Sequence, residues 1–116
     1  MTEVPQVAVS DLPIDAPPGA PGGIVLLDVR EDDEWQAGHA PGAIHVPLGQ
    51  VSSRLDELPE GREVHVVCRT GGRSQQVAAW LSRNGYDAAN VAGGMTAWAA
   101  AGRPMVADGD AEPFVR

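Results

Sequence analysis

Near-continuous apolar runs set the strongest limit on how this chain can fold. Residues 24–28 read I-V-L-L-D, and residues 64–68 read V-H-V-V-C. A strand that faces water on one side alternates apolar and polar residues. These runs do not alternate, which is typical of strands in a parallel sheet covered on both faces. Shorter runs at 43–46 and 88–92 predict two more strands, and residues 5–9 predict a short edge strand.

Amphipathic segments lie between these runs. In three of them apolar residues recur at spacings of three and four, which places them on one face of a helix. They are Leu48, Val51, Leu55 and Leu58 in the first, Val77, Trp80 and Leu81 in the second, and Met95, Trp98 and Ala99 in the third. Strands that alternate with helices predict an α/β fold with an open parallel sheet. The chain has 116 residues, 43% of them hydrophobic, which is the size of one compact domain.

The single cysteine of the chain stands where such folds bind ligands. In open α/β sheets, ligands bind beyond the carboxyl ends of the strands. Cys68 ends the second long apolar run, and Ser74 opens the next predicted helix. Gly71 and Gly72 allow the loop between them to curl, so that several backbone N–H groups can point at one centre. We therefore expect the functional site in this loop.

The charges around the loop favour an anion at its centre. Arg69 and Arg73 add full positive charges, and the start of the helix adds a partial one. The anion can be the cysteine itself, because a thiol with a pKa of about 8.5 is only a few per cent ionised at neutral pH and each unit of lowering gives about tenfold more thiolate. The sequence thus predicts a thiolate nucleophile at Cys68. The competing interpretation is an inert, buried Cys68 beside an ordinary glycine turn.

The loop Cys68-Arg69-Thr70-Gly71-Gly72-Arg73-Ser74 resembles that of single-domain rhodaneses, in which four residues separate the catalytic cysteine from an arginine. Further family-like stretches occur in the family's order. They are L-D-V-R at 27–30 with E-W at 34–35, G-H-A-P-G-A at 38–43, and G-G-M-T-A-W at 93–98 with A-G at 101–102. The similarity spans about residues 4–106, so it covers most of the chain.

The resemblance implies a five-stranded parallel sheet flanked by helices and a thiosulfate sulfurtransferase. We expect no cofactor, and no metal because His45 and His65 have no ligand spacing with Cys68. Its cysteine takes a sulfur from thiosulfate or a persulfide donor, becomes a persulfide, and passes the sulfur to cyanide, a thiol or a protein. Carried onto this sequence, the catalytic residues are Cys68 and Arg73. The substrate-binding residues are Arg69, Thr70, Gly71, Gly72, Ser74 and Arg30.

Three alternatives stay open at this point. A sulfur-relay or binding module with poor turnover would have the same loop. Phosphatases and arsenate reductases of the same fold have a loop one residue longer, so the four residues between Cys68 and Arg73 favour sulfur over phosphate. Arg30 either attracts substrate or forms an ion pair with a nearby acid, namely Asp28, Glu31 or Asp32.

The remaining segments suggest a simple layout. Residues 1–3 are an N-terminal tail, and residues 4–106 form the rhodanese-like domain. Within it, the Pro/Gly-rich stretch 15–23 is a loop or an insertion. Residues 107–116 form a polar C-terminal tail that we expect to be loose.

The formal net charge is -8, from 16 acidic residues against 8 basic ones, all of them arginine. This balance argues against nucleic-acid and anionic-membrane partners, and it leaves a small sulfur donor or a protein donor or acceptor as the expected partner.

A lone cysteine forms no internal disulfide, and the first ten residues contain neither a basic nor a long apolar segment. We therefore expect a cytoplasmic protein, in which a free thiol stays reduced.

Overall fold

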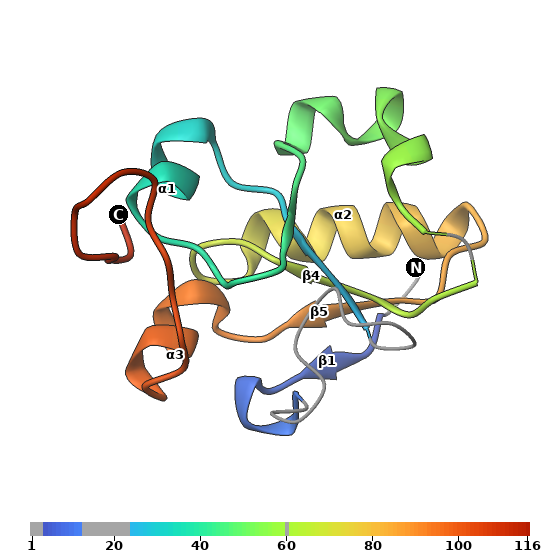
Figure 1. Cartoon of the computed structure of the whole chain (residues 1–116). Coiled ribbons are helices and arrows are strands. Elements are labelled where there is room, and N and C mark those ends of the chain that lie inside the picture. The colour runs from blue at the N-terminus through green and yellow to red at the C-terminus, as the bar shows by residue number, and fades with distance from the viewer. Residues whose placement is uncertain (1–3, 13–23, 60) are drawn as a thin grey trace.

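The computed structural model describes residues 4–12, 24–59 and 61–116 (Figure 1). It contains a five-stranded, wholly parallel sheet with strand order β1-β5-β4-β2-β3, which confirms the expected fold class. The strands are β1 (Gln6–Val7), β2 (Val25–Asp28), β3 (Ile44–His45), β4 (Val64–Val67) and β5 (Ala88–Val91). The predicted N-terminal tail and the Pro/Gly-rich stretch 15–23 lie outside the described residues.

Both faces of the sheet are covered, as the apolar runs predicted. Every residue of β2, β4 and β5 is buried. One face packs against α2 (Gly72–Arg83) and two short 3-10 helices, η2 (Leu48–Ser53) and η3 (Leu55–Glu57). The other face packs against η1 (Val9–Asp11) and α3 (Gly94–Ala100), so the sheet lies between two layers (Figure 1).

The segment 48–58 differs from the single helix that its periodicity predicts. It forms two 3-10 helices that meet at Arg54, whose φ of -123° is not helical. The Ser53 hydroxyl donates to the Gln50 carbonyl at 3.0 Å, and serine side chains that bond to nearby backbone in this way weaken a helix. Val51 and Leu58 are nevertheless buried, because a 3-10 spacing of three also keeps one apolar face.

The C-terminal segment is held on the domain and is not the loose tail that its polar composition suggested. The backbone N–H of Asp108 donates to the Gln36 carbonyl at 3.0 Å, and that of Phe114 donates to the Ala37 carbonyl at 3.0 Å. Both acceptors belong to α1 (Asp32–Ala37), and Val115 packs against the buried cluster on the α3 side of the sheet. Two backbone hydrogen bonds and the packing of one partly buried apolar side chain thus hold this segment on the domain despite its polar composition.

The topology directs attention to the carboxyl end of β4. This strand is the centre of the sheet, with β5 and β1 on one side and β2 and β3 on the other. The loop that joins β4 to α2 therefore emerges between the elements that follow the two neighbouring strands, α1 after β2 and α3 after β5 (Figure 1).

In the described part of the chain, no helix combines the length and the apolar character that crossing a bilayer requires.

Candidate active site

Cys68 follows the last residue of β4 and is 1% exposed. The chain then turns sharply, and Gly71 has a φ of +116° immediately before α2 begins. A β-carbon at Gly71 would meet only ordinary contacts at 3.6 Å or more. It is therefore the positive φ, and not lack of space, that calls for glycine at this position.

The turn surrounds the Cys68 sulfur with hydrogen-bond donors. The Gly71 N–H donates to Sγ at 3.1 Å, and the Ser74 Oγ lies 3.2 Å from Sγ. Burial raises the pKa of the Cys68 thiol, but hydrogen bonds from the Ser74 hydroxyl and from the backbone N–H groups of Ser74, Gly71 and Thr70 bring the pKa below its usual value. The loop therefore stabilises a thiolate, as expected for a nucleophilic cysteine.

The start of α3 fixes the other side of the loop. The backbone N–H of Met95 donates to the Cys68 carbonyl at 2.8 Å, and that of Thr96 donates to the Arg69 carbonyl at 3.0 Å. A β-carbon at Gly94 would lie 2.6 Å from the Arg69 carbonyl oxygen, closer than real contacts permit. Glycine at this position therefore lets α3 approach the loop backbone and satisfy its first N–H groups there.

Arg73 is anchored by a carboxylate that the sequence analysis did not assign to the site. Its Nη1 and Nη2 donate to Glu34 Oε1 and Oε2 at 2.7 and 2.9 Å. The hydrogen bonds from Arg73 lower the pKa of Glu34 to about 2, against an opposing effect of burial. Glu34 in turn raises the pKa of Arg73, so the guanidinium stays charged beside Cys68. The pair also ties α1 to the first turn of α2.

This ion pair predicts a loss of stability in acid. Because the pKa of Glu34 is about 2 in the folded chain against 4.5 in the unfolded chain, the unfolded chain takes up a proton first as the pH falls. The contribution is complete above pH 4.5 and is lost between about 4.5 and 2. We expect the Glu34→Gln variant to be less stable by about 1–2 kcal/mol at neutral pH, a figure reduced for screening of the partly exposed guanidinium. Urea unfolding at a series of pH values measures this.

The variant should also have a flatter pH profile than the parent over the same acid range. The amide that replaces the carboxylate retains an acceptor oxygen for the Glu31 N–H, so the helix cap is preserved. Asp33→Asn is the matched control, since Asp33 is 59% exposed and, within the described chain, its ion pair is with an equally exposed Arg116. An equal effect of the two substitutions would contradict the role given to the Glu34–Arg73 pair.

The other predicted loop residues lie at the surface. Arg69, Thr70 and Gly72 are exposed, and the Arg69 guanidinium pairs with no residue among those the structure describes. Within that part of the chain, Arg69 is thus the loop cation left available to an incoming anion. Arg73 contributes its charge from a fixed position, whereas Arg69 is solvated.

Arg30 occupies a buried site behind the loop. Its Nε and Nη2 bind the Asp28 carboxylate at distances of 2.7 to 3.1 Å, and Nη2 and Nη1 donate to the carbonyls of Gly38 and Glu34. Its side chain is 0% exposed. Of the two interpretations left open by the sequence, the geometry favours the ion pair with Asp28.

Two residues of the site were missed by sequence reasoning. In the sequence Glu34 appears only as part of the family-like E-W stretch at 34–35, and nothing in its local pattern indicates an arginine 39 residues away. Asn90 lies 2.5 Å from Ser74 Oγ through its Oδ1. Its signal was present, because it is the one polar residue in the buried strand A-A-N-V. Buried polar side chains need partners, so it merited attention.

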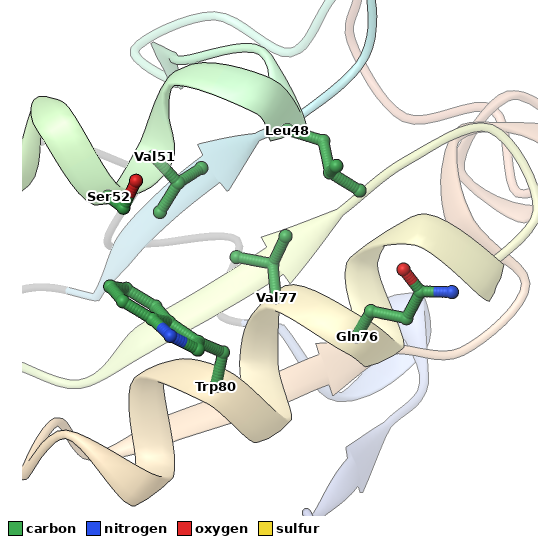
Figure 2. A pocket seen from close by; sticks show the side chains of 6 residues that line it. All are labelled: Leu48, Val51, Ser52, Gln76, Val77 and Trp80. Atoms are coloured by element: carbon green, nitrogen blue, oxygen red, sulfur yellow. The ribbon is translucent and has the colours of Figure 1, made fainter.

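A separate apolar pocket lies between η2 and α2 (Figure 2). Figure 2 shows the Trp80 ring forming one wall, with Val51 and Val77 beside it. The described residues that line the pocket are Leu48, Val51, Ser52, Gln76, Val77 and Trp80. None of these six has an ionisable side chain, so the pocket offers no charged group and no candidate nucleophile.

Comparison with known proteins identifies the family. The model of the rhodanese-like domain matches residues 16–101, and the chain belongs to this family. A protein of Bacillus subtilis that is named as a sulfurtransferase, YtwF, is 37% identical over 81 residues, which are 70% of this chain and 79% of the relative. A protein of the same organism that is named as a sulfur carrier, YrkF, is 40% identical over 74 residues, or 63% of this chain and 40% of that longer protein.

Solved structures agree with the family. A rhodanese-related protein from Thermoplasma volcanium superimposes with a TM-score of 0.77 at 28% sequence identity. The match covers 88% of this chain and 97% of that one. The likeness therefore extends over most of the fold.

Proposed function

We propose that the protein is a sulfurtransferase in which Cys68 carries a sulfane sulfur as a persulfide between a donor and a nucleophilic acceptor. The observation that carries the proposal is the hydrogen-bonded cradle around Sγ, with its Gly71 N–H at 3.1 Å and a lowered thiol pKa. Membership of the rhodanese-like family and the likeness to a protein named as a sulfurtransferase support sulfur transfer as the reaction class.

Thiosulfate is the simplest donor that suits this site. The Cys68 thiolate attacks the terminal sulfur of thiosulfate, the S–S bond breaks, and its electron pair leaves with sulfite. The products are a Cys68 persulfide anion and sulfite, so charge and atoms balance. An acceptor such as cyanide, a thiol or a protein thiolate then attacks the outer sulfur and returns the electron pair to Sγ. Since Cys68 is 1% exposed, donors that offer sulfur as a narrow terminal atom are favoured.

The loop residues have different roles in this scheme. The N–H groups of Thr70, Gly71 and Ser74 stabilise negative charge on sulfur in the free and loaded states. Arg69 attracts the dianionic donor against the net charge of -8, and Arg73 holds a fixed positive charge beside the loop. The free thiol that this scheme requires suits a reducing compartment such as the cytoplasm.

Incubation with thiosulfate followed by intact-mass measurement tests the proposal. We expect one added sulfur atom on the chain and release of thiocyanate when cyanide is then added. A chain that gains no sulfur from thiosulfate, from a small persulfide or from a protein persulfide would refute sulfur transfer. If only the persulfides load the chain, sulfur transfer stands as the reaction class, and the donor is a persulfide and not thiosulfate.

The exposed arginine gives a prediction specific to an anionic donor. We expect Arg69→Ala to raise the KM for thiosulfate about tenfold at low ionic strength, with a smaller effect as salt is added, because the lost attraction is solvent-screened. Steady-state kinetics at several salt concentrations measure it. Arg83→Ala, at the far end of α2, is the control and should leave KM unchanged. An unaltered KM for Arg69→Ala would remove this residue from donor binding.

A sulfur-relay carrier is the second candidate. The likeness to YrkF, which is named as a sulfur carrier, favours it. A carrier would load Cys68 in the same way but release sulfur slowly to cyanide and rapidly to one protein acceptor. The ratio of the loading rate to the release rate, followed by rapid-quench mass measurement, separates the two.

A further inference from the structure

A chain of polar side chains connects the Cys68 loop to the edge strand β1. Asn90 in β5 is 4% exposed and lies beside Gln6 in the register of the sheet. The Asn90 Oδ1 contacts Ser74 Oγ at 2.5 Å, and Ser74 Oγ lies 3.2 Å from Cys68 Sγ. Ser74 is 0% exposed, so water does not compete for its hydroxyl. The Ser74 hydroxyl alone thus stands between Asn90 and the sulfur.

The orientation of the Asn90 amide is determined by its neighbours. The Nδ2 lies 3.4 Å from the Gly71 carbonyl oxygen, which can only accept, and 2.8 Å from Gln6 Oε1. The end of the amide that faces Gly71 must therefore be the NH₂ group. The end that faces Ser74 is then the carbonyl oxygen Oδ1, which can accept a hydrogen bond but cannot donate one.

Ser74 cannot satisfy both of its neighbours at once. A hydroxyl has one proton, whereas the Asn90 carbonyl and a Cys68 thiolate are both acceptors only. When Cys68 is a neutral thiol, its S–H can donate to Ser74 Oγ, and Ser74 donates to Asn90. When Cys68 is a thiolate, Ser74 must turn its proton to Sγ and leave the buried Asn90 carbonyl without this donor. An acceptor left unpaired in a buried site is unfavourable.

We propose that Asn90 is a positioning residue that competes with Cys68 for the single Ser74 proton. It thereby limits the ionisation of Cys68, and it also limits how readily the Cys68 thiolate leaves the outer sulfur when that sulfur is transferred to an acceptor. In the loaded enzyme the negative charge lies on the outer sulfur, so Ser74 donates to Asn90. As an acceptor attacks the outer sulfur, the S–S electron pair moves to Sγ and the Ser74 proton turns toward it. The role in transfer rests on the proposed function, whereas the effect on ionisation does not.

The charged groups near the loop stay the same when only Asn90 is substituted. Arg73 on α2 faces Cys68, and Glu34 on α1 holds it bidentately. The described residues of α3 that close the loop, Gly94–Ala100, include no ionisable side chain. A substitution at Asn90 leaves the Glu34–Arg73 pair intact, but it also removes the contact of Asn90 Nδ2 with the Gly71 carbonyl. The part of the change in ionisation that depends on the Ser74 hydroxyl is therefore measured by repeating the substitution in a Ser74→Ala background.

The decisive variant is Asn90→Val, which fills the site with a residue suited to a buried strand. We expect the acid ionisation constant of the Cys68 thiol to rise about threefold to tenfold, the equivalent of one modest hydrogen bond. The pH dependence of alkylation by iodoacetamide on the full chain measures it without any sulfur donor. Asn90→Ala is a second variant that introduces no steric overlap, and the same direction is expected.

The Ser74→Ala background separates this competition from a general disturbance of the loop. Ser74→Ala alone should lower the ionisation constant, because the thiolate loses a donor. Adding Asn90→Val to Ser74→Ala should then change nothing further. If Asn90→Val has no effect on ionisation, lowers it, or raises it equally in both backgrounds, the proposal is overturned. Failure of sulfur loading with these ionisation shifts intact would count against the proposed function alone.

Discussion

We expect the Cys68→Ser variant to lose sulfur transfer by more than about a thousandfold. A serine hydroxyl at this position is hardly ionised at neutral pH, even in a cradle that favours an anion, and its oxygen cannot serve as the carrier of a sulfane sulfur. No other cysteine exists in the chain to take over the role. Intact-mass measurement after incubation with thiosulfate, together with the thiocyanate assay, gives the result.

The same substitution should barely affect the fold. Serine is close to cysteine in size, and its oxygen can accept the Gly71 N–H that now reaches Sγ at 3.1 Å. We expect the free energy of unfolding to change by about 1 kcal/mol or less. A stable Cys68→Ser protein that still gains and releases sulfur would disprove the persulfide mechanism. If the variant is unfolded, alkylation of Cys68 in the parent chain tests the site, and it should abolish sulfur loading.

Loss of the buried arginine should produce the largest change in stability. We expect Arg30→Met to reduce the free energy of unfolding by about 3–5 kcal/mol, because it strands the Asp28 carboxylate in a site where that side chain is 1% exposed. The carbonyls of Gly38 and Glu34 lose donors in the same variant. Since domains of this size have about 5–15 kcal/mol of stability in total, urea unfolding will detect the change easily.

Two comparisons identify the cause. Asp28→Asn combined with Arg30→Met removes the stranded charge and should recover part of the loss. Arg54→Ala breaks the exposed pair with Glu57 and should have a much smaller effect. If Arg30→Met instead raised the KM for thiosulfate while stability stayed unchanged, Arg30 would be a substrate-binding residue after all.

The sheet was accessible to prediction because its signal is local. Both long apolar runs became the strands β2 and β4, since a run with no polar alternation is stable only where both faces are covered. The helices at 77–81 and 95–99 followed for a similar reason, because each has one apolar stripe. The segment 48–58 was predicted less well. Its periodicity places the buried residues correctly but does not distinguish an α-helix from two 3-10 helices that break at Arg54.

The candidate site also has a part that is local in the sequence and a part that depends on the tertiary structure. The sequence by itself determined the glycine turn and the helix that follows it and pointed to Cys68 as the candidate nucleophile, because Cys68, Gly71 and Ser74 lie within seven consecutive residues. Only the tertiary structure decided what acts on that loop. Glu34 reaches Arg73 across 39 residues, and Asn90 is joined to Gln6 across 84. Such partners are chosen by strand order and packing, which bring distant residues together, and no local spacing encodes them.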